Sequence, residues 1–239
     1  MSGHSHWSSI KRGKEIEDKK RGKIFSKLSK IITLSAREKG GNPDANPKLR
    51  IAIEKAKEAN MPKDNIERAV KRGTGELAGE KLEEFIFEAY GPSGIAVIIE
   101  GITDNRKRAL GDIKQILNQY SGKLANEGSV KWLFERQGVL EIVKGENNSK
   151  EELELKAIEA GALDFFWHDE VLEIYTKPEE LENVKKNLEE SKLKIESASL
   201  GWIPKEKIKI EGKDKETSEK LFEALDENED VQEIYSNLL

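Results

Sequence analysis

The chain has 239 residues, of which 36% are hydrophobic and 36% are charged, and it contains no cysteine. This length suggests two or three domains. The lack of cysteine excludes disulfides, thiolate metal sites and cysteine nucleophiles, and it favours an intracellular protein. The longest apolar run, residues 95–99, is far shorter than the ~20 residues that span a bilayer, and no hydrophobic leader follows Met1.

The net charge of −5 conceals a split along the chain. Residues 1–75 carry 19 Lys and Arg against 9 Asp and Glu, a net charge of +10, whereas residues 76–239 carry a net charge of −15. The change falls in a Gly-rich stretch, which indicates a domain boundary. A basic module ahead of acidic ones favours a polyanion as its partner. The alternative is a charged helical surface that has an excess of basic residues without binding anything.

Residues 14–38 are predicted to form an amphipathic helix. Its apolar side chains follow the spacing of one helical face and are Ile24, Phe25, Leu28, Ile31 and Ile32. A second, neighbouring face carries Lys20, Lys23, Lys27 and Lys30. This lysine row suits a row of phosphates. The alternatives are a solvated flank or a helix on a membrane surface; the membrane is disfavoured because a small bundle needs the apolar face for its own core.

Two shorter helices are expected to complete a bundle. Asn46-Pro47 provides an N-cap followed by Pro at the first helical position. Met61-Pro62 begins the third helix, and Gly73 is expected to end it. The first ten residues are interpreted as an arm in which Trp7 either stacks on a nucleobase or docks on the bundle. His4 and His6 lack a third ligand, so no metal site is predicted.

The acidic remainder alternates strands and helices. Residues 82–90 and 95–102 are predicted to form a hairpin, followed by a helix over 104–120 and strands over 130–134 and 139–143. Residues 138–200 then follow the βαββαβ order of a ferredoxin-like unit. The tail is expected to add a strand at 206–211, a helix at 215–227 and a strand at 230–235, which complete the sheet begun by the hairpin.

The predicted fold class is therefore an α+β multidomain protein, with an N-terminal helical bundle and two α+β (ferredoxin-like) domains. The expected boundaries are 1–78 for the basic helical domain, 79–135 plus 203–239 for a discontinuous domain, and 136–202 for an inserted domain.

No catalytic motif is present in the sequence. It has neither a phosphate-binding G-x-x-x-x-G-K-[ST] loop nor an H-E-x-x-H pair, and His168 has no nucleophile motif nearby. Phe85 and Phe87 are expected in a core rather than on a base-stacking surface. We therefore expect a protein that is not an enzyme and that uses no cofactor or metal.

Several segments resemble the YebC/PmpR family over the whole chain. They are GHSHW at 3–7, DKKRGKIFSKL at 18–28, GNPDANPKLR at 41–50, NMP at 60–62, YGPSG at 90–94, TDNR at 103–106, GSV at 128–130 and DVQEIY at 230–235. The sequence departs from the family at His6, Gly13 and Lys48, which slightly lowers the positive charge.

The resemblance implies a cytoplasmic, cofactor-free protein with a helical domain and two α+β domains. Some family members are described as transcriptional regulators that bind promoter DNA. Others, including the mitochondrial translational activator of cytochrome oxidase, act in translation, and relief of ribosome stalling at proline-rich stretches is attributed to bacterial relatives. Both descriptions need a polyanion-binding face and neither assigns a catalytic residue.

We therefore predict a nucleic-acid-binding regulatory protein, with DNA or ribosomal RNA as its target and no membrane partner. Binding to duplex DNA is expected to depend mostly on phosphates, with weak sequence preference. The acidic domains are expected to point away from the phosphates and toward a basic protein. The predicted nucleic-acid-binding residues are Trp7, Lys11, Arg12, Lys14, Lys19, Lys20, Arg21, Lys23, Lys27, Lys30 and, in the middle domain, Arg106.

Overall fold

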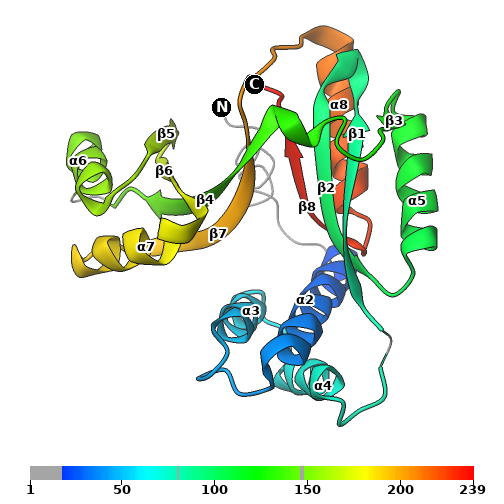
Figure 1. The fold of residues 1–239 in the computed structure, drawn as a ribbon, viewed down its shortest axis with the longest axis horizontal. Coiled ribbons are helices and arrows are strands. Elements are labelled where there is room, and N and C mark those ends of the chain that lie inside the picture. The colour runs from blue at the N-terminus through cyan, green and yellow to red at the C-terminus, as the bar shows by residue number, and fades with distance from the viewer. Residues whose placement is uncertain (1–17, 80, 146–147) are drawn as a thin grey trace.

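The structure is a computed structural model that describes residues 18–79, 81–145 and 148–239, with side chains from residue 21 onward. Within these ranges, three helices precede two four-stranded sheets, and all strand pairs in both sheets are antiparallel. Figure 1 shows the helices in blue and cyan below the sheets. The predicted α+β multidomain fold class is confirmed. No helix in the described ranges is long and apolar enough to cross a membrane.

The helical region consists of α2 (Asp18–Lys39), α3 (Pro47–Glu58) and α4 (Lys63–Thr74). The Asn46 side chain begins α3 as predicted, because its Oδ1 accepts the Leu49 N–H at 3.1 Å. The same side chain donates to the Ser35 and Gly40 carbonyls, which ties the turn to the end of α2. The predicted apolar face of α2 forms the core of this region together with Leu49 and Ile66.

Gly73 does not end α4, contrary to the prediction. The helix continues to Thr74, and Gly75 closes it with a left-handed φ of 83°. Gly73 instead lies against α2, where a Cβ atom would come within 2.4 Å of the Thr33 carbonyl oxygen. The glycine is therefore needed for close packing of α4 on α2 rather than for termination.

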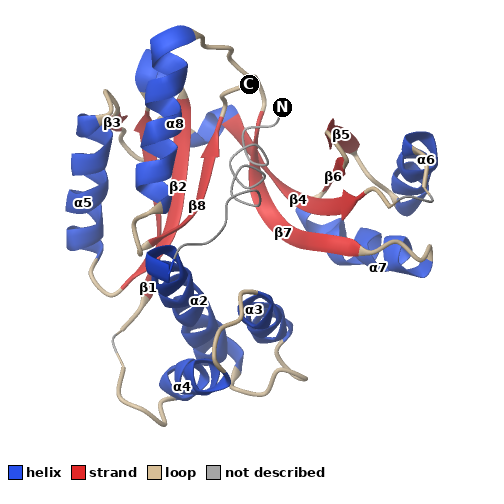
Figure 2. Cartoon of the chain, turned by 180° about the vertical axis from the view of Figure 1, so that it is seen from behind, coloured by secondary structure: helices blue, strands red, loops and turns tan. Residues whose placement is uncertain are grey.

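The first sheet has the strand order β3 (Lys123–Leu124), β1 (Glu83–Tyr90), β2 (Ala96–Thr103) and β8 (Val231–Ser236). The expected hairpin is present, with Phe87 opposite Ile99. Helices α5 (Arg106–Gln119) and α8 (Gly212–Asp226) cover one face of this sheet (Figure 2), and both contribute to its core. Phe85 and Phe87 lie in that core.

The second sheet has the order β5 (Asp164–His168), β6 (Val171–Thr176), β4 (Phe134–Val143) and β7 (Ile195–Pro204). Helices α6 (Lys150–Ala160) and α7 (Leu181–Glu190) pack on one of its faces. The element order β4-α6-β5-β6-α7-β7 is the predicted βαββαβ unit.

β4 and β7 form a long two-stranded ribbon that takes part in both sheet cores. They pair from Phe134 opposite Pro204 to Ile142 opposite Ile195. Phe134 and Trp202 pack against residues of the first sheet, whereas Leu140 and Ile142 belong to the core of the second.

Two predicted strands are corrected by the structure. Residues 131–133 form a 3-10 turn rather than part of a strand, and β4 begins only at Phe134. The Glu88 carboxylate holds this segment by accepting the N–H groups of Gly128, Val130 and Lys131 at 2.6–2.7 Å. Burial by itself raises the pKa of Glu88, but these hydrogen bonds outweigh it and the pKa is lowered.

The second correction concerns residues 206–211, which were expected to form a strand. This segment makes only one isolated parallel bridge, between Ile208 and Leu238. The predicted C-terminal strand does form, as β8, and it pairs with β2.

Candidate nucleic-acid interface

Three lysines of the row on α2 face the chain's own C-terminal part. Lys23 lies 3.7 Å from the Glu227 carboxylate. Lys27 donates to the Asp226 carbonyl at 2.6 Å and to its carboxylate at 3.0 Å, and only 7% of Lys27 is exposed. Lys30 donates to the Glu229 carbonyl at 3.0 Å and to the Asp230 carboxylate. Lys27 and Lys30 are thus paired with the chain's own carboxylates, and the assignment of the lysine row to nucleic acid stays a prediction.

Asp230 is the buried centre of this contact. Besides Lys30, its carboxylate accepts from Arg108 at 3.0 Å and from the Thr103 hydroxyl at 3.1 Å, and the residue is 4% exposed. Arg108 also contacts Asp104 at 2.6 Å. Burial by itself raises the pKa of Asp230, but the hydrogen bonds from Lys30 and Arg108 outweigh it and lower the pKa. The acidic segment 226–230 thus holds the helical region against the first sheet.

The other predicted nucleic-acid-binding residues are either exposed or outside the described part of the chain. Arg21 is exposed on α2. Arg106 is exposed at the start of α5, with its guanidinium 5.4 Å from the centre of the Phe87 ring. Trp7, Lys11, Arg12 and Lys14 lie outside the described residues, as do the side chains of Lys19 and Lys20. The assignment of all these residues to nucleic acid stays a prediction.

A second set of basic side chains in the helical region is exposed. These residues have no ion pair or hydrogen bond to any side chain within the described ranges, which distinguishes them from the lysine row. They are Arg37, Lys39, Arg50, Lys55, Lys57, Lys71 and Arg72. We refer to them as the free cations. The sequence analysis did not assign them to a site, although their number was visible in the net charge of the first 75 residues.

A groove of about 770 Å³ runs between α2 and α4. Arg68 and Arg72 line it from α4, and Lys30 lines it from α2. Its apolar lining comes from Phe25, Met61 and the linker to the first sheet. Sequence reasoning missed this site, although the i, i+4 spacing of the two arginines places them on one side of a helix.

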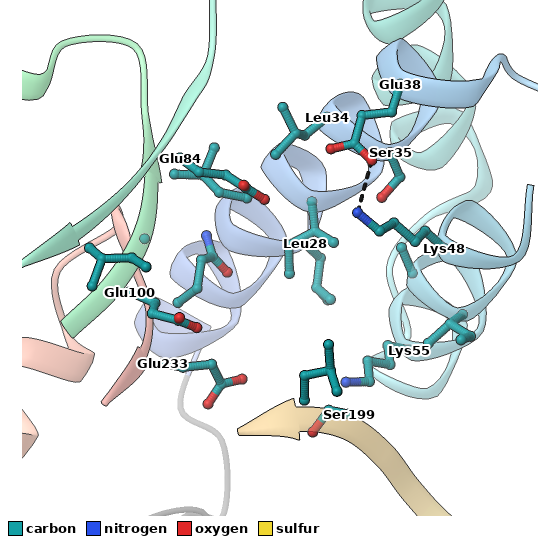
Figure 3. Close-up of a pocket in the computed structure, with 18 of the residues that line it drawn as sticks. Leu28, Leu34, Ser35, Glu38, Lys48, Lys55, Glu84, Glu100, Ser199 and Glu233 are labelled. Atoms are coloured by element: carbon teal, nitrogen blue, oxygen red, sulfur yellow. Dashed lines mark hydrogen bonds and ion pairs between the residues drawn. The ribbon is translucent and has the colours of Figure 1, made fainter. Parts of the chain in front are cut away.

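A different cleft of about 480 Å³ lies where the helical region meets the two sheets. Figure 3 shows Glu38, Glu84, Glu100 and Glu233 around it, with Lys48 and Lys55 on the side of α3. Lys48 and Glu38 form an ion pair at 2.9 Å. Glu100 and Glu233 stand directly opposite each other on β2 and β8, an arrangement in which like charges repel. With four carboxylates against Lys48, Lys55 and Arg136, the lining of this cleft has a formal net charge of −1.

Glu100 is the best satisfied carboxylate of that cleft. It accepts from Arg136 at 3.1 Å and from the Trp202 indole at 2.7 Å. No group of three or more His, Cys, Asp or Glu side chains that could hold a metal occurs among the described residues.

Together, the fold and these surfaces define an α+β multidomain protein with a basic helical region and acidic sheet-containing regions. The chain belongs to the TACO1/YebC family. The model described as "TACO1/YebC protein N-terminal domain" matches residues 5–76, and the one described as "TACO1/YebC second and third domain" matches residues 82–238. The resemblance seen in the sequence is thereby confirmed.

Relatives match along almost the entire chain. A protein of Halothermothrix orenii is 49% identical over 241 residues, covering 99% of this chain and 94% of the relative. A protein of Thermoanaerobacter pseudethanolicus is 48% identical over 238 residues, covering 100% of this chain and 97% of the relative. Both are named probable transcriptional regulatory proteins. The crystal structure of a conserved hypothetical protein, Aq1575, from Aquifex aeolicus superposes with a TM-score of 0.88 at 45% identity, covering 98% of this chain and 96% of that one.

Proposed function

We propose that this protein regulates gene expression by binding nucleic acid through its helical region. The observation that carries the proposal is the set of free cations. They remain exposed on all three helices, whereas Lys23, Lys27 and Lys30 are paired internally. The names of the relatives, probable transcriptional regulatory proteins, agree with a regulatory role. In this proposal the protein acts without catalysis or a cofactor.

The contacts are expected to be mainly with phosphates. Arginine and lysine side chains that point outward from three separate helices neutralise a polyanion but do not read base edges as a single recognition helix does. The sheet-containing regions, which hold most of the acidic side chains, would face away from the phosphates and are available to a basic protein. We expect weak sequence preference and a strong dependence of affinity on salt.

The proposal is tested by measuring the affinity of the full chain for a 20-base-pair duplex and for a structured RNA at several salt concentrations. The test variant is Lys39→Gln/Lys57→Gln/Lys71→Gln, which removes three free cations. Each lost phosphate contact reduces the slope of log affinity against log salt by ~0.9 on duplex DNA, so we expect a reduction of about 2.7.

A matched variant controls for the loss of three lysines elsewhere. Lys186, Lys194 and Lys209 lie in the sheet-containing regions, and each is within 4.0 Å of a glutamate. The variant Lys186→Gln/Lys194→Gln/Lys209→Gln is expected to leave the slope unchanged. Equal slopes for the two triple variants would overturn the assignment to the helical region, and absence of salt-dependent binding in the unmodified chain would overturn the proposed function.

DNA and the ribosome remain the two alternatives for the target, and sedimentation of the protein from cell extract separates them. Stable co-migration with ribosomal particles would favour a role in translation and contradict a pure promoter regulator. A promoter-specific footprint at physiological salt, without such co-migration, would favour transcriptional regulation.

A further inference from the structure

The groove between α2 and α4 combines a cationic rim with an apolar floor. Lys30, Arg68 and Arg72 are its charged lining residues, and the described lining contains no carboxylate. Phe25, Met61 and Leu82 provide apolar surface. Hydroxyl and amide groups complete the lining, from Ser26, Ser29 and Asn65. One carboxylate lies at the edge: Ser26 donates to Glu229 at 3.2 Å.

The two arginines are placed along the groove by the geometry of α4. They are four residues apart, so their Cα atoms are separated by ~6 Å along the helix axis. Arg68 is oriented by hydrogen bonds to the Asp64 carbonyl at 3.3 Å and to the Asn65 side chain. Arg72 is exposed, and its side chain has no hydrogen bond or ion pair within the described residues. A guanidinium group can bind two phosphate oxygens at once, so the pair can hold neighbouring phosphates of one strand.

The apolar floor discriminates between forms of nucleic acid. Phe25 is only half-buried, although it packs against the core of the helical region. A duplex presents phosphates on its outside and keeps its base faces stacked inside, so it would leave this floor uncovered. A single strand presents phosphates together with base and sugar faces, and positively charged grooves with aromatic side chains are the usual means of binding it.

We propose that this groove binds single-stranded nucleic acid, with phosphates on Arg68 and Arg72 and a base or sugar face against Phe25. The inference rests on the proposed function and names the form of nucleic acid and the residues that select it. The central cleft, which contains the opposed pair Glu100 and Glu233, has a formal net charge of −1 and therefore favours the same ligand less than the groove does.

The test compares the affinity of the full chain for two probes by fluorescence anisotropy. One probe is a labelled 12-nucleotide single strand of mixed sequence, and the other is the same strand annealed to its complement. The variant Arg68→Gln/Arg72→Gln is expected to bind the single strand about tenfold more weakly and to reduce the salt slope by ~1.4, because two contacts are lost. Its affinity for the duplex should change less, with a slope reduction of at most ~0.9, because of the two arginines only Arg72 belongs to the free cations.

Arg37→Gln/Arg50→Gln is the matched control, because both arginines are exposed in the helical region and neither lines the groove. This control variant should bind both probes more weakly, and to a similar extent. All four arginines are exposed, so thermal unfolding of the two double variants should match that of the unmodified chain. Phe25→Leu keeps the packing apolar but removes the ring, and it should weaken single-strand binding about fivefold without affecting the duplex.

The outcomes separate the two proposals. Salt-dependent binding of the unmodified chain to both probes, with equal losses in the groove and control variants, would overturn the groove assignment and leave the proposed function intact. Binding to neither probe would overturn both. A selective loss of single-strand affinity in the groove variant would support the inference.

Discussion

The lysine row of α2 and the free cations of α2, α3 and α4 have the same chemistry and opposite surroundings. Lys27 and Lys30 are paired with Asp226 and Asp230 and take part in the contact between two regions of the molecule. Lys57 and Lys71 are exposed and have no ion pair among the described residues. A run of basic residues therefore indicates a binding surface only after the chain's own carboxylates have been accounted for.

The largest effect on stability is expected at Lys27. Lys27→Glu places a carboxylate against Asp226 in a site where the lysine side chain is 9% exposed. Breaking a buried ion pair costs about 3–5 kcal/mol of unfolding free energy. Lys57→Glu, on the exposed surface of α3, should change it by less than about 0.5 kcal/mol. Urea unfolding of both variants measures the two losses of unfolding free energy. Losses of similar size would contradict the distinction between the paired lysine row and the exposed free cations.

Asp230 should link this contact to pH. Its pKa is lowered in the folded protein, so its contribution to stability is present above the unfolded pKa of ~3.9 and is lost as the pH falls toward the folded value. Asp230→Asn removes charged hydrogen-bond partners of Lys30 and Arg108 and should cost about 2 kcal/mol at pH 7. The difference in unfolding free energy between the variant and the unmodified chain should narrow as the pH falls below ~4. A difference that stays constant at low pH would contradict this role of the Asp230 carboxylate.

The packing of α4 on α2 can be tested with the variant Gly73→Ala. A Cβ atom there would lie 2.4 Å from the Thr33 carbonyl and 2.6 Å from the Ala36 Cβ, and such overpacking costs about 1–3 kcal/mol. Gly22→Ala is the control, because its Cβ would have no neighbour within 4 Å and alanine is favoured over glycine in a helix by up to ~1 kcal/mol. Thermal unfolding should therefore move in opposite directions for the two variants.

The smallest effect on stability should come from the free cations. Lys57→Gln/Lys71→Gln is expected to change the unfolding free energy by less than about 0.5 kcal/mol, while reducing the salt slope for duplex binding by ~1.8. Lys27→Met provides the contrast, because it should lower stability without a comparable change in slope. If Lys27→Met reduced the salt slope and Lys57→Gln/Lys71→Gln did not, the phosphate contacts would instead lie on the lysine row.

The sequence predicted local features of the helical region well because they depend on neighbours along the chain. The N-cap at Asn46 and the apolar face from Ile24 to Ile32 are both present in the structure. The lysine row also lies on one face of α2, but its partner could not be read from periodicity. Lys27 and Asp226 are 199 positions apart, and no local pattern states which distant carboxylate will meet a lysine.

The missed features depend in the same way on distant contacts. The segment 131–133 has strand-like residues, yet the Glu88 carboxylate draws the N–H groups of Val130 and Lys131 away from any strand partner. Gly73 follows a helical pattern and resembles a stop, but the structure uses it for the approach of α4 to α2. The groove with Arg68 and Arg72 exists only because that approach occurs.

The ribbon of β4 and β7 has a mechanical consequence. The second sheet is joined to the first by two strands that are hydrogen-bonded to each other from Phe134 and Pro204 to Ile142 and Ile195. A single linker chain swivels freely, whereas a paired ribbon resists bending and returns to its shape, because bending strains its backbone hydrogen bonds. Trp202 fixes one end of the ribbon through its hydrogen bond to Glu100. Displacement of the second sheet by a partner would therefore be elastic, and the sheet would return to its original position when the partner dissociates.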